Sequence, residues 1–192
     1  MNKTIILAMV LGLGSVAVAG DGKDAKAPAP KAPDKAMEMP KAPKEVADMA
    51  KAMTGTWNCT GKGIMPDGSS IDMTASFKSK ADLDGFWVHD SLDGKMGKMA
   101  YKFEAFSTYD AATKKWRKLG VDNMGGSSVG TSDGVKDNKV EWAVESTSMM
   151  GQMTEKEHME MGDAKTGTKV WGEMTMDKGK TWKKSYEVVC KK

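Results

Sequence analysis

The chain has 192 residues, with 29 Lys and Arg, 26 Asp and Glu, and a formal net charge of +3. This length fits one domain with appendages and excludes a large multidomain enzyme, and so balanced a charge excludes a nucleic-acid binder that relies on a basic face. The chain has only two Cys, which excludes a small scaffold held by many disulfides, but its 18 Met are unusual.

Residues 1–19 have the features of a cleaved signal peptide. Lys3 gives a positive start, an uncharged apolar run follows from Thr4, and the run ends in the small-x-small motif Ala17-Val18-Ala19. The run is shorter than the roughly 20 residues that a membrane span needs. We therefore expect cleavage before Gly20 and export to the periplasm or the extracellular space, with no stable membrane anchor; an uncleaved anchor is the alternative.

Two segments of different character precede the folded domain. Residues 20–43 hold five of the six prolines and few large apolar side chains, which is typical of a disordered, extended linker. Residues 44–53 place Val46, Met49 and Met53 at helical spacing. This spacing predicts a short amphipathic helix that packs against the domain and closes one end of it.

Residues 54–192 predict consecutive antiparallel strands. Apolar and polar side chains alternate, as at Ile71, Met73, Ala75 and Phe77, which indicates half-buried strands. Turn dipeptides such as Asp67-Gly68 separate the segments. The predicted strands are 54–63, 71–81, 85–93, 98–109, 115–122, 127–132, 139–148, 152–162, 168–177 and 181–191. Ten such strands favour an all-β, antiparallel up-and-down barrel, with a β-sandwich as the alternative.

The two cysteines lie in the first and last predicted strands. Cys59 is in phase with Trp57, and Cys190 is in phase with Tyr186 and Val188. Because the first and last strands of a closed meander are neighbours, we expect a Cys59–Cys190 disulfide in an exported chain. Two unpaired buried thiols are the alternative.

Three segments of the domain carry a resemblance to a known family: Gly55-Thr56-Trp57 at its start, Tyr109 to Trp116 in its middle and Asp177 to Glu187 near its end. Together, over about residues 54–190, they resemble the bacterial DUF1579 family of lipocalin-like proteins in the calycin superfamily. The resemblance implies a β-barrel with no assigned activity.

The same opening also resembles nitrobindin, a haem-binding ten-stranded barrel. Nitrobindins carry their haem-ligating His in the final strand, but residues 181–191 contain no His. Cys59 also stands where that family's opening motif has a glycine. The resemblance therefore does not extend to haem, and we expect no cofactor.

The residues with catalytic potential are few. His89 and His158 are isolated in the sequence, and we interpret them as surface or hydrogen-bonded residues. No segment has zinc-ligand spacing, a phosphate loop or a G-x-S-x-G motif. Glu155 and Glu157 are interpreted as part of a solvated strand face. We therefore expect no catalytic residue and no enzymatic activity.

The apolar and aromatic side chains that alternate onto one face of the strands suggest a binding function. We hypothesise that the barrel binds a small apolar molecule, since Met-rich interiors adapt to ligands of loose shape. The predicted pocket wall is Trp57, Ile71, Met73, Phe77, Trp87, Tyr101, Phe103, Trp142, Val144, Met174 and Tyr186.

Two other functions compete with this hypothesis. Thioethers favour Cu(I), so a Met-rich periplasmic copper-binding protein is one alternative, with His158, Met159 and Met161 as a weak candidate ligand set. The other is a structural or interaction module whose barrel is filled by its own side chains. The sequence names no protein partner.

Overall fold

The computed structural model describes residues 39–192, except residues 66, 150 and 164. The predicted signal peptide at 1–19 and the linker as far as residue 38 lie outside the described residues. The described part of the chain contains the predicted helix and the β domain.

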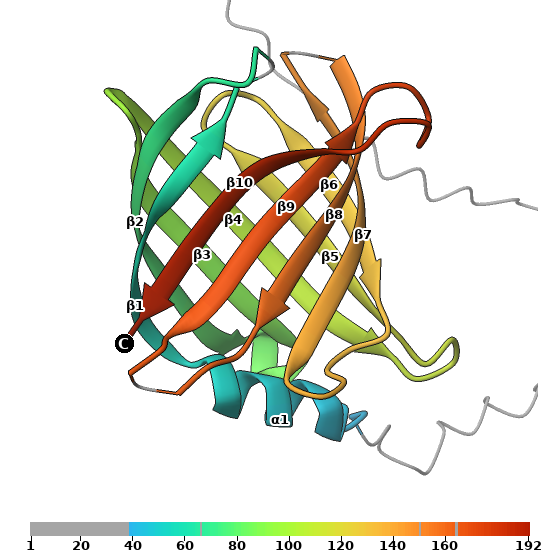
Figure 1. Ribbon diagram of the computed structural model, residues 1–192. Coiled ribbons are helices and arrows are strands. Elements are labelled where there is room, and N and C mark those ends of the chain that lie inside the picture. The colour runs from blue at the N-terminus through green and yellow to red at the C-terminus, as the bar shows by residue number, and fades with distance from the viewer. Residues whose placement is uncertain (1–38, 66, 150, 164) are drawn as a thin grey trace, which may run out of the picture. The chain divides into compact units, whose positions relative to one another are not determined.

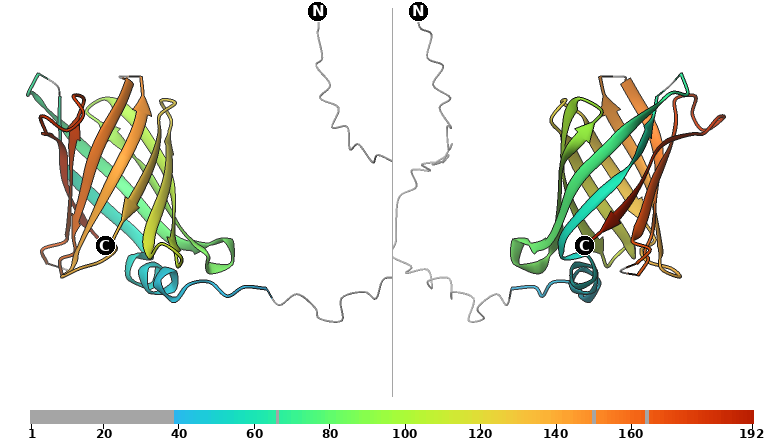
Figure 2. Two further views of the ribbon diagram at one scale, coloured as in Figure 1. Left: turned by 90° about the vertical axis from the view of Figure 1, so that its right-hand side faces the viewer. Right: turned by 60° about the vertical axis from the view of Figure 1, so that its left-hand side comes forward.

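Ten antiparallel strands form one closed barrel (Figures 1 and 2). The strands are β1 (Gly55–Ile64), β2 (Ser70–Asp82), β3 (Trp87–Met96), β4 (Met99–Asp110), β5 (Lys115–Asp122), β6 (Ser127–Ser132), β7 (Lys139–Ser148), β8 (Gly151–Glu160), β9 (Thr168–Thr175) and β10 (Lys183–Lys191). Each strand pairs with its neighbours in sequence, and β1 pairs with β10. The prediction of an up-and-down barrel is confirmed, and the β-sandwich alternative is wrong.

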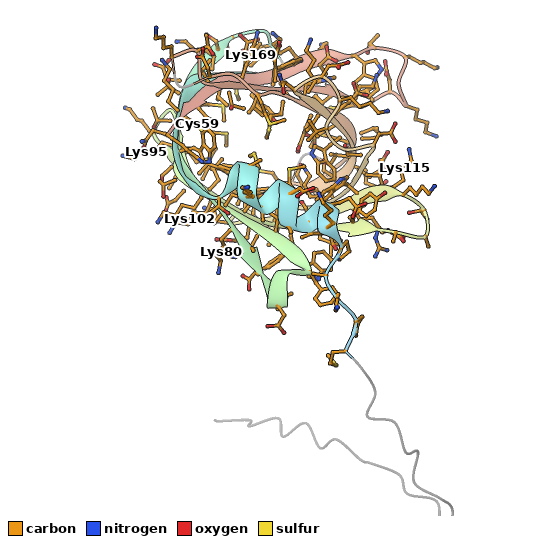
Figure 3. The ribbon with its side chains drawn as sticks, turned by 90° about the horizontal axis from the view of Figure 1, so that it is seen from below. Cys59, Lys80, Lys95, Lys102, Lys115 and Lys169 are labelled. Atoms are coloured by element: carbon orange, nitrogen blue, oxygen red, sulfur yellow. A yellow bond between two sulfur atoms is a disulfide. The ribbon has the colours of Figure 1, made fainter. Side chains whose placement is uncertain are left out.

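The closed sheet separates two sets of side chains. One set faces the lumen, the space that the ten strands enclose, and the other faces outward. Figure 3, which looks along the barrel, shows Lys80, Lys95, Lys102 and Lys169 outside the wall. This alternation is what the period-two pattern of the sequence predicts.

Helix α1 (Lys44–Met53) lies at one end of the barrel (Figures 1 and 3). Val46 and Ala50, which are 0% and 5% exposed, pack against Val88 of β3 and Trp116 of β5. The helix is tied to β1 where Trp57 Nε1 donates a hydrogen bond to the backbone oxygen of Met53, at 2.9 Å. The predicted helix is confirmed, and it forms an apolar floor at this end of the lumen.

The helices of the described region are short. Within residues 39–192, apart from the three positions named above, no helix has the length and apolar character needed to cross a membrane.

A disulfide joins the first strand to the last. Cys59 and Cys190 are directly opposite each other in the β1–β10 ladder, with their Cα atoms 3.9 Å apart, and their sulfurs are bonded. Both side chains are buried. The predicted pairing is confirmed, and the bridge lies across the seam that closes the barrel.

We expect removal of this bridge to destabilise the barrel strongly. The bonded cysteines are 131 residues apart, so in the chain-entropy model the double variant Cys59→Ala/Cys190→Ala loses about 5 kcal/mol of unfolding free energy. Urea unfolding followed by tryptophan fluorescence measures the loss. Wild-type protein unfolded under a thiol reductant is the control and should match the variant; a loss below about 1 kcal/mol would contradict the model.

Candidate functional site

A group of polar side chains projects into the lumen beyond the apolar floor. On β3 and β5, Asp90 and Lys118 lie two residues beyond Val88 and Trp116, and so face the same side of the sheet. The lumen cluster, as we call it, consists of Asp90, Tyr101, Lys118, Glu155, Glu157 and Tyr186. Its members come from β3, β4, β5, β8 and β10, and therefore converge from different parts of the wall.

One ion pair lies at the centre of this cluster. The Lys118 ammonium donates to the Glu157 carboxylate, and the Lys118 side chain is only 8% exposed. Lys118 Nζ also lies 5.0 Å from the centre of the Trp142 ring, within range of a cation–π interaction. The cluster's single ammonium is therefore already engaged.

Glu155 and the two tyrosines add further polar groups. Ser146 donates a hydrogen bond to Glu155, and burial raises the pKa of this carboxyl group. Burial also raises the pKa of the Tyr101 and Tyr186 hydroxyls, and the nearby Glu155 and Glu157 carboxylates add to the effect. The tyrosines therefore remain protonated and keep an O–H group to donate.

Asp90 is incompletely satisfied. It lies opposite Ser79 in the β2–β3 ladder, and Ser79 is only 3% exposed. Burial raises the pKa of Asp90, while the nearby Ser79 hydroxyl and the Lys118 ammonium oppose that rise. Although they are neighbours, neither Asp90 Oδ1 nor Ser79 Oγ makes a well-formed hydrogen bond with any residue that the structure describes. Since buried polar atoms are nearly always hydrogen-bonded, these two atoms indicate a place for a further polar group.

Inward side chains beside the cluster keep accessible surface. Tyr186 faces inward from β10, and its side chain is only half-buried. Its ring lies over Gly172, where a Cβ atom would come within 2.4 Å of Tyr186 Cε1, and the Phe103 ring lies over Gly120 in the same way. These glycines let the two rings lie against the wall, so the rings do not fill the centre of the barrel.

Ten of the eleven predicted pocket residues lie on the inward phase of their strands. All of them remain half-buried except Val144, which is 2% exposed. Trp57 belongs to the end closed by α1, because it bonds to Met53 and its ring centre lies 4.6 Å from Lys192 Nζ. The ten are Trp57, Ile71, Met73, Phe77, Tyr101, Phe103, Trp142, Val144, Met174 and Tyr186.

Trp87 is the exception, and its predicted position was wrong. Its neighbours Val88 and Asp90 face inward, while Trp87 itself makes an edge contact with Phe106 at 6.5 Å between ring centres. Phe106 in turn stacks on His89, whose Nε2 lies 2.6 Å from Glu104. Trp87 therefore belongs to an aromatic group on the outer face, and it does not line the lumen.

The three residues proposed as weak metal ligands are not brought together. His158 lies on the outer face of β8, stacked on Trp171 at 4.9 Å, with its ring nitrogens 3.4 Å from Glu141 and 3.5 Å from Glu173. Met159 follows it directly and so faces inward, and Met161 lies beyond the end of the strand. In the described ranges, no three His, Cys, Asp or Glu side chains form a group that would hold a metal ion.

Two surface hollows adjoin the barrel. One, of about 490 Å³, lies over β7 to β9 and includes His158, Trp171 and Glu141. The other, of about 400 Å³, lies at the end of the barrel opposite α1 and includes Ile64 and Met174. Only the second adjoins predicted wall residues, because Met174 belongs to both sets.

Most of the lumen cluster was missed by reasoning from the sequence. Glu155 and Glu157 were interpreted as solvated, whereas both face the lumen, and Asp90 and Lys118 were not singled out. The sequence did contain a signal. Asp90 lies two residues from both Val88 and Leu92, and Lys118 lies two residues from Trp116, so each charged residue is on the same face of its strand as apolar residues. A charge in phase with buried apolar residues indicates an inward position.

Comparison with known proteins places this architecture in a family. A family model described as "Protein of unknown function (DUF1579)" matches residues 42–192. The chain belongs to the DUF1579 family. The match includes α1, so the helix that closes the barrel is part of this DUF1579 domain. Comparison with the curated proteins found no match.

A solved structure shares the fold. The DUF1579 barrel is similar to the crystal structure of Rv2717c from M. tuberculosis, with a TM-score of 0.58 and 7% sequence identity. The similarity covers 79% of this chain and 99% of that chain. At this identity, the likeness concerns the fold alone.

The raised pKa of Asp90 predicts how the stability of an Asp90→Asn variant, relative to wild type, changes with pH. A carboxyl group with a raised pKa in the folded state destabilises the fold when it is charged, and this penalty disappears as pH falls through the folded-state pKa. We therefore expect Asp90→Asn to be at least as stable as wild type at pH 8, and to lose this relative advantage on acidification toward pH 4. Urea unfolding at both pH values measures the difference.

The outward-facing Asp93 on the same strand provides the control. Asp93→Asn removes an exposed charge, so its stability relative to wild type should change little between the two pH values. If Asp90→Asn is destabilised most at pH 8, Asp90 is charged and well paired in the folded protein, contrary to this account.

Proposed function

We propose that this DUF1579 barrel is a non-enzymatic protein that binds a small, largely apolar molecule in its lumen. The observation that carries the proposal is that the inward aromatic side chains of Tyr101, Phe103, Trp142 and Tyr186 are only half-buried, although they lie on the inner face of a closed sheet. Small-molecule sites are typically concave and apolar, with a few placed polar groups. The aromatic wall and the lumen cluster fit that description.

The end opposite α1 is the route that we propose for the ligand. The apolar floor of Val46, Val88 and Trp116 blocks the other end. The hollow beside Ile64 and Met174 lies at the open end, and half-buried Met73 and Met96 face inward from the neighbouring strands. Flexible thioether side chains at this mouth can adjust to a passing ligand.

We also propose that the protein is exported after removal of residues 1–19. The Cys59–Cys190 disulfide supports this proposal, because such bonds persist in oxidising compartments. The linker at 20–43 would then separate the barrel from the new N-terminus.

We expect the folded protein to bind a neutral apolar dye such as N-phenyl-1-naphthylamine with micromolar affinity, about −8 kcal/mol. Binding should quench tryptophan fluorescence, because Trp142 lies on the lumen wall. Met73→Trp places extra volume inside the mouth and should weaken dye binding at least about tenfold, at a stability cost of roughly 1–3 kcal/mol.

Thr74→Trp is the matched control, since Thr74 is the next residue along β2 and is exposed on the outer face. It should leave the dye affinity unchanged. If the wild type binds no dye, or if both variants bind as the wild type does, the lumen is not the binding site.

One observation favours copper binding as a second candidate function. Met73, Met96 and Met99 are consecutive cross-strand partners on β2, β3 and β4, at the mouth of the barrel. Directly paired residues have Cβ atoms about 5 Å apart, and three thioethers form a soft ligand set of the kind that Cu(I) prefers. This set replaces the His158-based one, whose members face different ways.

Anaerobic competition for Cu(I) against a chromophoric chelator, with ascorbate as reductant, tests this candidate. If the row binds copper, Met96→Leu should weaken the affinity at least about tenfold, since one soft ligand is lost. Met159→Leu, which removes an inward thioether elsewhere, is the control. Failure of the wild type to compete with the chelator would eliminate the candidate.

A further inference from the structure

The charges that face the lumen do not balance. The lumen cluster has three carboxyl groups, on Asp90, Glu155 and Glu157, but its only cation is Lys118, and that ammonium is paired with Glu157. Glu155 is held by one hydroxyl group, from Ser146. Asp90 Oδ1 accepts no well-formed hydrogen bond from any described residue. Asp90 and Glu155 therefore form no ion pair with a residue that the structure describes, although the Lys118 ammonium attracts both carboxyl groups.

The unsatisfied atoms define where such a partner would lie. Ser79 Oγ, in a residue that is only 3% exposed, lies across the ladder from Asp90 and also has no well-formed hydrogen bond in the described region. The Tyr101 and Tyr186 hydroxyls line the same region, since the carboxylates of Glu155 and Glu157 act on both. These groups present acceptor atoms into a space that aromatic rings surround.

From this arrangement we infer that the lumen selects amphiphilic amines: molecules with an apolar body and an ammonium group that Asp90 binds beside Ser79, with the Glu155 carboxyl group adding negative charge to the same lumen. This inference rests on the proposed function, because it names the class of ligand for the same lumen. An ammonium group supplies donors to Asp90 Oδ1 and Ser79 Oγ and balances the excess negative charge. Charge-assisted hydrogen bonds in a site shielded from water are the strong ones.

The geometry disfavours the other charged ligands. An anion would face Asp90 and Glu155 with only the engaged Lys118 to attract it. A hard metal ion such as Ca²⁺ would need several carboxylates close together, and no group of three His, Cys, Asp or Glu side chains that could hold one occurs in the described ranges. An organic ammonium needs only two or three acceptors around it, and its apolar body suits the walls formed by Phe77, Phe103 and Trp142.

Three ligands with one apolar body and different heads test the inference. Octylamine, octanol and octanoate are titrated at pH 7.5 into the mature protein loaded with N-phenyl-1-naphthylamine, and displacement of the dye gives each affinity. We expect octylamine to bind at least about tenfold more tightly than octanol, the size expected for one charge-assisted hydrogen bond. Octanoate should bind most weakly.

Variants test which residues cause the preference for octylamine over octanol. Asp90→Asn and Glu155→Gln keep the shape of each side chain but remove its charge, and together they should reduce the preference for octylamine over octanol to about twofold or less. Dye binding shows that each variant is folded. Asp93→Asn, an outward-facing carboxyl group on the same strand as Asp90, is the matched control and should keep the full preference.

The outcomes separate this inference from the proposed function. If octanol binds as well as octylamine, or octanoate binds best, the lumen binds apolar molecules but the ammonium preference is wrong. If the preference survives in the double variant, the ammonium lies elsewhere and the assignment of Asp90 and Glu155 is overturned. If neither the dye nor any octyl compound binds, the proposed function fails and the inference fails with it.

Discussion

Closure of the sheet between β1 and β10 is the constraint on which the rest of the structure depends. With that pairing made, the backbone of every strand has a neighbour on both sides, and no strand edge is left open to other chains. The pairing joins segments far apart in sequence, which makes it the most costly in chain entropy. The Cys59–Cys190 bridge lies within this seam and reduces the entropy of the unfolded chain by the same route.

Closure with ten strands gives a wider interior than closure with eight. An eight-stranded barrel is just wide enough to be packed by its own residues. Here the fully buried apolar cluster is confined to the end covered by α1, around Val46, Val88 and Trp116. Beyond it, the inward positions hold mostly half-buried aromatic and apolar side chains, together with glycines such as Gly120 and Gly172 and the charged residues of the lumen cluster. The apolar floor therefore acts as the core, and most inward side chains of the wall above it are only partly buried.

The sequence predicted the framework well and the chemistry of the lumen poorly. Strand positions and the helix at 44–53 follow from periodicity and turn residues, which act locally, and the disulfide follows from the closed meander that makes the first and last strands neighbours. Trp87 was misplaced because its large aromatic side chain faces outward while the charged side chain of Asp90, on the same strand, faces inward. This is the reverse of the usual rule. Just before it, Leu83 and Asp84 adopt positive φ values of 47° and 58°, and this turn fixes the phase of β3. Nor could the sequence show that Lys118 and Glu157, 39 residues apart, meet inside the barrel.

The difference in charge between the outer face and the lumen of the barrel affects how a ligand would be selected. The chain carries a formal net charge of +3, and lysines such as Lys80, Lys95 and Lys102 lie on the outside (Figure 3), whereas the lumen cluster has more carboxyl groups than ammonium groups. A chain with a small net positive charge does not attract cations over a long range, so an amine gains no advantage in its association rate. Any preference for an amine must then arise from contacts made after it has entered, and it would appear as slower dissociation. If those contacts include Asp90, whose Oδ1 accepts no well-formed hydrogen bond from a described residue, the cost of desolvating this atom falls on the empty barrel, and a ligand that supplies the missing donor recovers it.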